Sequence, residues 1–140
     1  MSSKKDKHIE NAQKFILKGQ LEKAVIDLEQ AVALDPADLK VRQRLAETLV
    51  KVNRQKDAVS HYETIGKSFD NNGFYLKAIA VYKQIQKLDP DNTKLSITLA
   101  ELNVKHGLIG NALAEFSQAV NFYLKSGKQK EALELLERML

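Results

Sequence analysis

Apolar residues recur at helical spacing along the chain. In one stretch Ala78, Tyr82 and Ile85 follow each other at intervals of four and three residues, so they share one face of a helix. Pro90 then ends that helix, because proline disfavours a helical conformation at the residue before it. The same arrangement of small, large and apolar residues occurs earlier in the chain and ends at Pro36. The pattern therefore predicts two helices of the same kind.

Glycine, asparagine and proline gather at short breaks between the apolar stretches. Between these breaks we predict eight helices, at about residues 6–18, 21–34, 38–52, 55–71, 74–88, 92–106, 109–126 and 128–140. Because only a few residues separate them, consecutive helices should lie antiparallel as neighbours. Each helix has too narrow an apolar face to be stable alone, so we expect them to stack.

Small residues show that the chain contains a duplication. Ala58 follows Ala24 by 34 residues, and Ala78 follows Ala58 by 20 residues. The same two intervals then lead from Ala78 to Ala112 and on to Ala132. Sliding residues 21–79 onto 75–133 also aligns the proline loop and several charged residues. The sequence is therefore built on a 54-residue super-repeat, composed of a 34-residue and a 20-residue interval.

A helix–turn–helix period of about 34 residues resembles that of the tetratricopeptide repeat family. The small, large and proline positions of that family fall in the first repeat on Ala12, Phe15, Ala24, Leu28, Ala31 and Pro36, and in the third on Tyr62, Ile65, Gly66, Phe69, Ala78, Tyr82, Ile85 and Pro90. The resemblance implies an all-α, right-handed α-solenoid of antiparallel helix pairs. The 20-residue interval implies that helices 55–71 and 109–126 each serve two successive repeats.

The length of 140 residues suits one domain, so we expect residues 1–140 to form a single solenoid of this type, with residues 1–5 as a flexible basic start. The last helix runs to Leu140 without a glycine, proline or polar cap, and Leu133, Leu136 and Leu140 lie on one stripe. The preferred interpretation is that residue 140 is a truncation point in a longer protein. The alternative is an open end that a partner covers.

Composition and charge narrow the classes of function. A hydrophobic content of 44% with 29% charged residues argues against disorder. Of the net charge of +4, residues 1–20 carry +3, from five lysines against Asp6 and Glu10. Two acidic residues interrupt this basic start and no aromatic residues are interleaved for base stacking, so we predict a solvated face and no nucleic-acid binding.

No apolar run approaches membrane-spanning length, and no apolar segment of a secretory signal follows the N-terminal lysines. We therefore expect a cytoplasmic protein that does not insert into membranes. The sequence resembles the opening repeats of long bacterial multi-repeat proteins.

Residues suited to chemistry are scarce. The chain has no cysteine, and His8, His61 and His106 have no second ligand at metal-binding spacing. Nucleotide-loop and nucleophile-elbow motifs are absent. We expect no enzyme activity, no cofactor and no metal, and structural or surface roles for the histidines.

In the tetratricopeptide family the first helix of each repeat lines a concave groove that binds a protein or peptide. The groove residues implied here are Lys40, Gln43, Arg44, Glu47 and Lys51 in helix 38–52, and Lys94, Ile97, Thr98, Glu101 and Lys105 in helix 92–106. One interpretation is a mixed-charge groove for an extended peptide or helix. The other is that Glu47/Lys51 and Glu101/Lys105 are i,i+4 ion pairs, each stabilising an exposed helix by a few tenths of a kcal/mol.

The resemblance thus implies a non-catalytic scaffold or adaptor that binds a partner polypeptide on its concave face. The alternative is a self-associating structural module, in which Leu133, Leu136 and Leu140 form the contact of a homo-oligomer through the C-terminal end.

Overall fold

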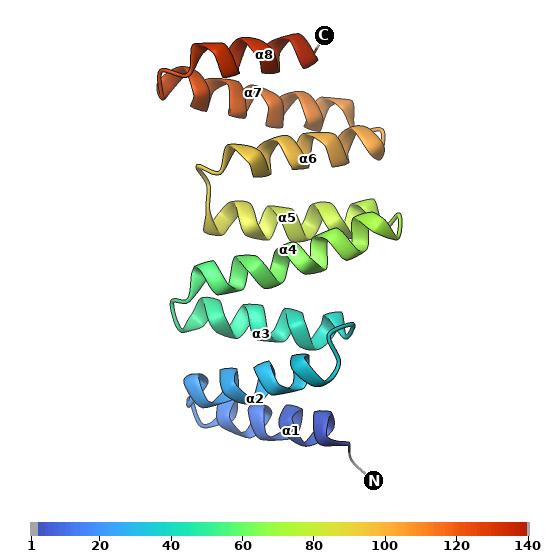
Figure 1. The fold of residues 1–140 in the computed structure, drawn as a ribbon, viewed down its shortest axis with the longest axis vertical. Helices are drawn as coiled ribbons and strands as arrows, with labels where there is room; N and C mark the ends of the chain where they lie inside the picture. Colours follow the sequence, from blue (N-terminus) through green and yellow to red (C-terminus); the bar gives the residue numbers. More distant parts are fainter. Residues whose placement is uncertain (1–2, 140) are drawn as a thin grey trace. The chain divides into compact units, whose positions relative to one another are not determined.

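The computed structural model describes residues 3–139, and all regular secondary structure within that range is α-helical (Figure 1). The helices are α1 (Lys4–Leu17), α2 (Leu21–Leu34), α3 (Leu39–Lys51), α4 (Gln55–Asn71), α5 (Tyr75–Leu88), α6 (Thr93–Lys105), α7 (Ile109–Lys125) and α8 (Gln129–Met139). Every predicted helix is present, and each boundary that lies in the described residues falls within two residues of its predicted place. The predicted all-α class is confirmed.

The chain divides into two compact units, Met1–Ile65 and Gly66–Leu140, with the boundary inside α4. In the first unit α1 packs on α2, and α2 packs on α3. In the second unit α5 packs on α6, α6 on α7, and α7 on α8. The prediction that the chain is a single domain stays a prediction.

The turn between α3 and α4 and the turn between α4 and α5 are built alike. Gly73 adopts a left-handed φ of 78° after α4, and the N–H of Phe74 then donates to the carbonyl of Phe69 at 2.8 Å. Asn53 takes the corresponding place after α3 with a φ of 63°, and asparagine tolerates this conformation better than most residues. This arrangement satisfies carbonyl groups that a helix end leaves open.

The proline loop is also built twice. After Pro36, the carboxylate of Asp38 accepts a hydrogen bond from the N–H of Val41 at 3.3 Å and caps α3. After Pro90, the side-chain oxygen of Asn92 accepts from the N–H of Leu95 at 3.1 Å and caps α6. A capping side chain thus follows each proline and starts the next helix.

Helix α1 begins earlier than the sequence pattern predicted. The hydroxyl of Ser3 accepts from the N–H of Asp6 at 3.1 Å, and the Asp6 carboxylate accepts from the N–H of Ser3, which completes a capping box. Lys4 and Lys5 therefore belong to α1. The prediction of a flexible start over residues 1–5 stays a prediction, and residues 1 and 2 lie outside the described range.

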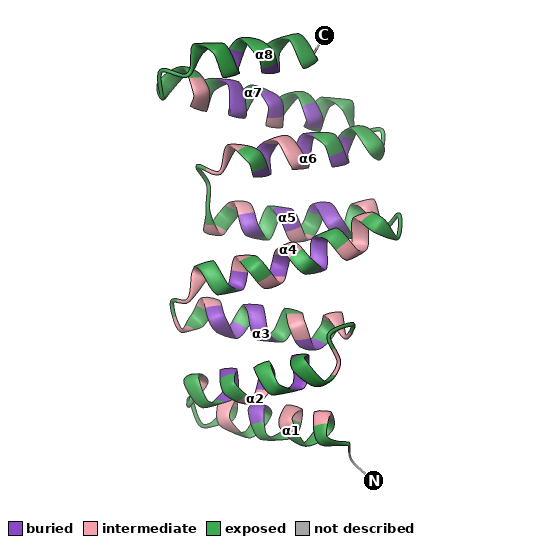
Figure 2. Cartoon of the chain, in the orientation of Figure 1, coloured by how far each residue is buried: buried purple, intermediate pink, exposed green. Residues whose placement is uncertain are grey.

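Small residues are buried where the repeat pattern placed them. Eight alanines of the repeat pattern have at most 2% of their surface exposed: Ala12, Ala24, Ala46, Ala58, Ala78, Ala100, Ala112 and Ala132. Figure 2 shows buried positions in purple along the helices, alternating with exposed positions in green. A side chain at Gly66 would bring its Cβ within 2.8 Å of the Tyr82 ring. Small side chains thus permit the close approach of helices within each unit.

Asn103 of α6 is a buried polar residue at a position where the repeat pattern has a large one. Its exposed fraction is only 1%, and its amide donates to the carbonyl of Leu99 at 2.8 Å. The polar side chain occupies a large-residue position because its own helix satisfies it. Separately, none of the helices in the described range is long and apolar enough to cross a lipid bilayer.

Candidate functional site

The residues predicted for the first half of the groove lie together on the exposed side of α3. Lys40, Gln43, Arg44, Glu47 and Lys51 are all exposed, whereas the apolar residues of the same helix face the core of the first unit. The first four of them line a shallow hollow of about 250 Å³. The helical period therefore produces the predicted surface on α3.

A second hollow of about 290 Å³ adjoins the first and shares Lys40 and Arg44 with it. Apolar side chains contributed by three helices line this second hollow: Ile9 of α1, Leu28 of α2 and Val41 of α3. We call the two hollows together the α3 face. It combines two basic side chains with a partly apolar floor.

Most of the carboxylates around the α3 face already have partners. Asp38 accepts from the ammonium of Lys5 at 3.1 Å, and Glu47 accepts from the amide of Gln43 at 3.2 Å. Burial works to raise the pKa of Asp38, but hydrogen bonds from Lys5 and from the backbone hold that pKa below its ordinary value. Asp38 is therefore ionised and engaged at neutral pH.

The two cations of the α3 face are available. The side chains of Lys40 and Arg44 form no hydrogen bond or ion pair with any described residue, and both residues are exposed. A positive charge beside a hollow favours a carboxylate as the group that fills it.

The residues predicted for the second half of the groove are arranged differently. Ile97 packs against the core of the second unit, and the hydroxyl of Thr98 donates to the carbonyl of Lys94 at 3.0 Å. Glu101 accepts from the Arg138 guanidinium of α8 at 2.7 Å. Lys105 contacts Asp70 and Tyr75 of the same unit. This part of the predicted groove is largely occupied by contacts within its own unit.

Lys105 contacts two groups of the second unit. Its ammonium lies 3.1 Å from the Asp70 carboxylate and 5.6 Å from the centre of the Tyr75 ring. The hydrogen bond that the Lys105 ammonium donates to the Asp70 carboxylate raises the pKa of Lys105 above its ordinary value. Neither of the i,i+4 pairs considered for α3 and α6 is among the ion pairs of residues 3–139, since Glu101 and Lys105 bond to other helices.

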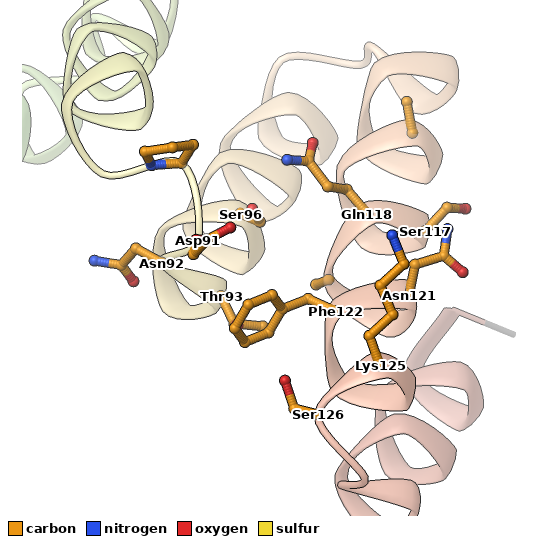
Figure 3. Close-up of a pocket in the computed structure, with 13 residues that line it drawn as sticks. Asp91, Asn92, Thr93, Ser96, Ser117, Gln118, Asn121, Phe122, Lys125 and Ser126 are labelled. Atoms are coloured by element: carbon orange, nitrogen blue, oxygen red, sulfur yellow. The ribbon is translucent and has the colours of Figure 1, made fainter.

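A third hollow of about 600 Å³ lies between the start of α6 and α7, and the sequence analysis did not predict it (Figure 3). Uncharged polar side chains of α7 line much of it, including Ser117, Gln118 and Asn121, with Phe122 and Lys125 beside them. The groove positions used for helices 38–52 and 92–106, if also applied to helix 109–126, select Ser117, Asn121 and Lys125. The sequence analysis recognised the double role of that helix but did not apply the groove positions to it.

Two of the three histidines bond to neighbouring side chains. His8 Nδ1 lies 2.8 Å from an Asp27 oxygen, and Arg42 Nη1 donates to His61 Nδ1 at 3.1 Å. Burial and the neighbouring Arg42 lower the pKa of His61, so its ring is neutral and can accept this bond. Within the described residues no three His, Asp or Glu side chains are grouped so that they could hold a metal ion.

Residues 15–38 match the family model described as Tetratricopeptide repeat. That segment holds Phe15, Ala24, Leu28 and Pro36, which are residues that carried the resemblance. This match covers one segment of the chain and agrees with the resemblance seen in the sequence. This family's fold is generally a protein-interaction scaffold, and its members are generally without enzyme activity.

Solved structures of tetratricopeptide-repeat proteins are similar to this chain over most of its length. A MamA fragment from Desulfovibrio magneticus RS-1 is 13% identical with a TM-score of 0.45, over 99% of this chain and 94% of that one. TTC0263 from Thermus thermophilus is 17% identical with a TM-score of 0.42, over 97% and 90%.

A tetratricopeptide repeat protein from Parabacteroides merdae ATCC 43184 is 17% identical with a TM-score of 0.44, over 99% of this chain and 60% of that one. No curated protein matches the sequence significantly. At these identities and TM-scores we infer nothing about ligands from the similar structures.

Proposed function

We propose that this protein is a non-catalytic interaction module that binds a partner polypeptide on the α3 face. The observation that carries the proposal is the pair of unpartnered cations, Lys40 and Arg44, shared by two adjoining hollows. We also propose that the protein acts as a scaffold or adaptor in the bacterial cytoplasm, as we predicted from the sequence.

The chemistry of the α3 face favours an extended segment that carries an acidic residue next to an apolar one. The hollow beside Ile9 suits an apolar side chain, because its filling would remove the exposed part of Ile9 from water. The ammonium of Lys40 and the guanidinium of Arg44 suit carboxylates, and a guanidinium can bind one with two parallel hydrogen bonds. Since both cations are exposed, each pair should contribute only about 0.2–1 kcal/mol.

The hollow between α6 and α7 supports binding of polypeptide in a second way. The side-chain amides of Gln118 and Asn121 can each donate and accept hydrogen bonds, as the peptide backbone does. Ser117 and Lys125 add further donors at the same surface. We therefore include this hollow as a second contact surface for polypeptide, distinct from the α3 face.

A peptide-binding titration tests the α3 face. The probe is a labelled twelve-residue peptide of alternating aspartate and leucine, compared with its asparagine–leucine counterpart by fluorescence anisotropy. Replacing two cations by carboxylates in Lys40→Glu/Arg44→Glu converts two attractive pairs into repulsive ones. We expect roughly tenfold weaker binding of the aspartate peptide.

The matched control is Lys83→Glu/Lys87→Glu, which makes the same change of charge at exposed positions of α5. The control should bind the aspartate peptide nearly as well as the unaltered protein, once the general charge effect is screened at about 0.15 M salt. Equal weakening by both double variants would contradict a specific role for the α3 face.

A further inference from the structure

The hollow between α6 and α7 includes a position that an arginine occupies in the first copy of the super-repeat. Arg42 of α3 corresponds to Ser96 of α6, 54 residues further along the chain. The Arg42 guanidinium donates to the carbonyl of Pro36 and to His61 Nδ1, each at 3.1 Å. In the second copy Ser96 lines the hollow of about 600 Å³. The shorter side chain therefore leaves room where the first copy has a guanidinium.

The acceptors that the guanidinium uses have counterparts in the second copy. Pro36 corresponds to Pro90, which lines the hollow, and the carbonyl of Pro90 accepts no hydrogen bond from any described residue. His61 corresponds to Glu115, whose carboxylate accepts one hydrogen bond from the described residues, from a side-chain amide of α5 at 3.0 Å. A carboxylate, which can accept several hydrogen bonds, thus stands where the first copy has a neutral ring.

The hydroxyl of Ser96 is open to the hollow. Ser96 is only 3% exposed, and its side chain forms no hydrogen bond with any described residue. Among the described residues, Arg42 Nε is the one side-chain nitrogen or oxygen that is fully buried without a partner, so the Ser96 hydroxyl keeps some accessible surface. A nearly buried, unpartnered hydroxyl in the wall of a hollow indicates a ligand with a hydrogen-bonding group.

Two further differences between the copies favour a positively charged ligand. Asp91 replaces Ala37 beside the proline, and its exposed carboxylate has no partner among the described residues. Phe122 replaces Ser68, and Figure 3 shows its ring extending from α7 toward the start of α6. A guanidinium binds a carboxylate and also stacks on an aromatic ring. The second copy thus lacks a cation of its own here and has gained two groups that attract one.

The cation that lines the hollow, Lys125, lies on α7. In Figure 3 its side chain runs along α7 toward Asn121, whereas Asp91 lies at the start of α6. Because Lys125 is exposed, its ammonium is hydrated and salt screens its repulsion of another cation. The α6 side of the hollow is therefore the favourable place for a guanidinium.

We propose that the hollow between α6 and α7 takes an arginine side chain of a bound polypeptide. In the bound state the guanidinium donates to the Pro90 carbonyl, the Asp91 carboxylate and the Ser96 hydroxyl, and it lies against the ring of Phe122. Lysine fits these groups less well, because an ammonium has neither the planar face nor the fork of donors. The inference rests on the proposed role of this hollow as a second contact surface for polypeptide, and it names the side chain that the hollow selects.

The test compares labelled nine-residue peptides of serine and asparagine that differ only at the central residue. The central residue is arginine, lysine or citrulline, which is uncharged and has nearly the same shape as arginine. In fluorescence anisotropy titrations with the full chain, we expect the arginine peptide to bind about tenfold more tightly than the citrulline peptide, which loses the charge-assisted hydrogen bonds. The lysine peptide should bind more weakly than the arginine peptide.

Two variants locate the binding. Ser96→Arg restores the arginine of the first copy and fills the hollow from within, so the arginine peptide should bind at least about tenfold more weakly. Asp91→Lys reverses an exposed charge without a change in the core, and it should weaken binding about fivefold. Circular dichroism checks that both variants keep their helices.

The matched control is Glu134→Lys, which makes the same change of charge at an exposed position of α8. It should bind the arginine peptide nearly as well as the unaltered protein does at about 0.15 M salt. Ser96→Arg should also bind the aspartate–leucine peptide as the unaltered protein does, which separates this test from that of the α3 face.

Three results would overturn the arginine site: an arginine peptide that binds no better than the citrulline peptide, one that binds no better than the lysine peptide, or equal weakening by Asp91→Lys and Glu134→Lys. If Ser96→Arg still weakened all the peptides, the hollow would remain a contact surface for polypeptide. Absence of binding by every peptide would overturn both the arginine site and the role of this hollow in the proposed function.

The oligomeric state is measured alongside, because association of the protein also changes the anisotropy. Self-association through α8 stays a prediction: Leu133 and Leu136 are exposed, and Leu140 of the same stripe lies outside the described residues. Light scattering gives the concentration below which the protein does not associate, and titrations below it report on the hollow alone.

Discussion

Ala78 is fully buried at a place where α5 approaches its neighbours, and Ala80 on the same helix is exposed. A charged side chain would be buried without a partner at position 78, but it would be hydrated at position 80. The sequence alone distinguished the two, because only Ala78 recurs at the intervals of the repeat.

We therefore expect Ala78→Glu to lower the free energy of unfolding by about 3 kcal/mol or more, since it buries an unpaired charge in a packed interior. Ala80→Glu, the matched control, should change it by less than about 0.5 kcal/mol. Urea unfolding followed by circular dichroism measures both. Similar unfolding midpoints for the two variants would show that α5 does not approach its neighbours closely at Ala78.

Other residue-level features could not be predicted. The burial of Asn103 depends on a hydrogen bond to its own helix, and the repeat pattern indicated only a missing large residue. The start of α1 depends on Ser3, whose cap does not belong to any apolar pattern. Hydrophobic periodicity places the middle of a helix better than its ends, because capping side chains decide the ends.

At the scale of elements, α2, α3 and α4 meet around a single histidine in the first unit. His61 of α4 accepts from Arg42 of α3 at 3.1 Å, and the carboxylates of Glu29 and Asp57 also act on it. Arg42 in turn donates to the carbonyl of Pro36 at 3.1 Å. The neutral ring of His61 thus contributes to the junction of three helices.

The lowered pKa of His61 sets the direction of a pH effect. In the unfolded chain the pKa of a histidine is about 6.5, so the unfolded state binds a proton more readily than the folded state does. The free energy of unfolding should therefore fall as the pH is lowered below about 6.5. His61→Gln, which keeps an acceptor for Arg42, should reduce the loss of stability between about pH 7.5 and pH 5.5.

Urea titrations at the two pH values measure this difference. His106→Gln serves as the control, because His106 is exposed and bonds to other described residues only through its backbone. If His61→Gln loses as much stability as the unaltered protein over this interval, His61 is not neutral in the folded state.

The duplicated elements also show where sequence reasoning stopped. Helices α3 and α6 align with Lys40 on Lys94 and Glu47 on Glu101, yet Glu47 bonds only to Gln43 of its own helix whereas Glu101 bonds to Arg138 of α8. The partner of Glu101 comes from α8, which lies far along the chain, and no local pattern indicates such a pair. Of the predicted groove, only the α3 half therefore remains a candidate site.

At the scale of the whole molecule, the repeat accounts for the architecture and for the exposed residues of the proposed α3 face. Within each unit, thin amphipathic helices bury their small residues by packing on one another, which leaves exposed faces such as that of α3. The fold class and all eight helices were predictable because they depend on local periodicity. The open and occupied parts of the groove were not, because they depend on pairs between helices.

The central claim is that the α3 face binds acidic, partly apolar polypeptide, and amide NMR maps that face directly. On addition of the aspartate–leucine peptide to the labelled protein, we expect chemical-shift changes concentrated at Ile9, Leu28, Lys40 and Arg44, and absent with the asparagine–leucine peptide. Shifts that avoid these residues, or that are the same for both peptides, would contradict the account.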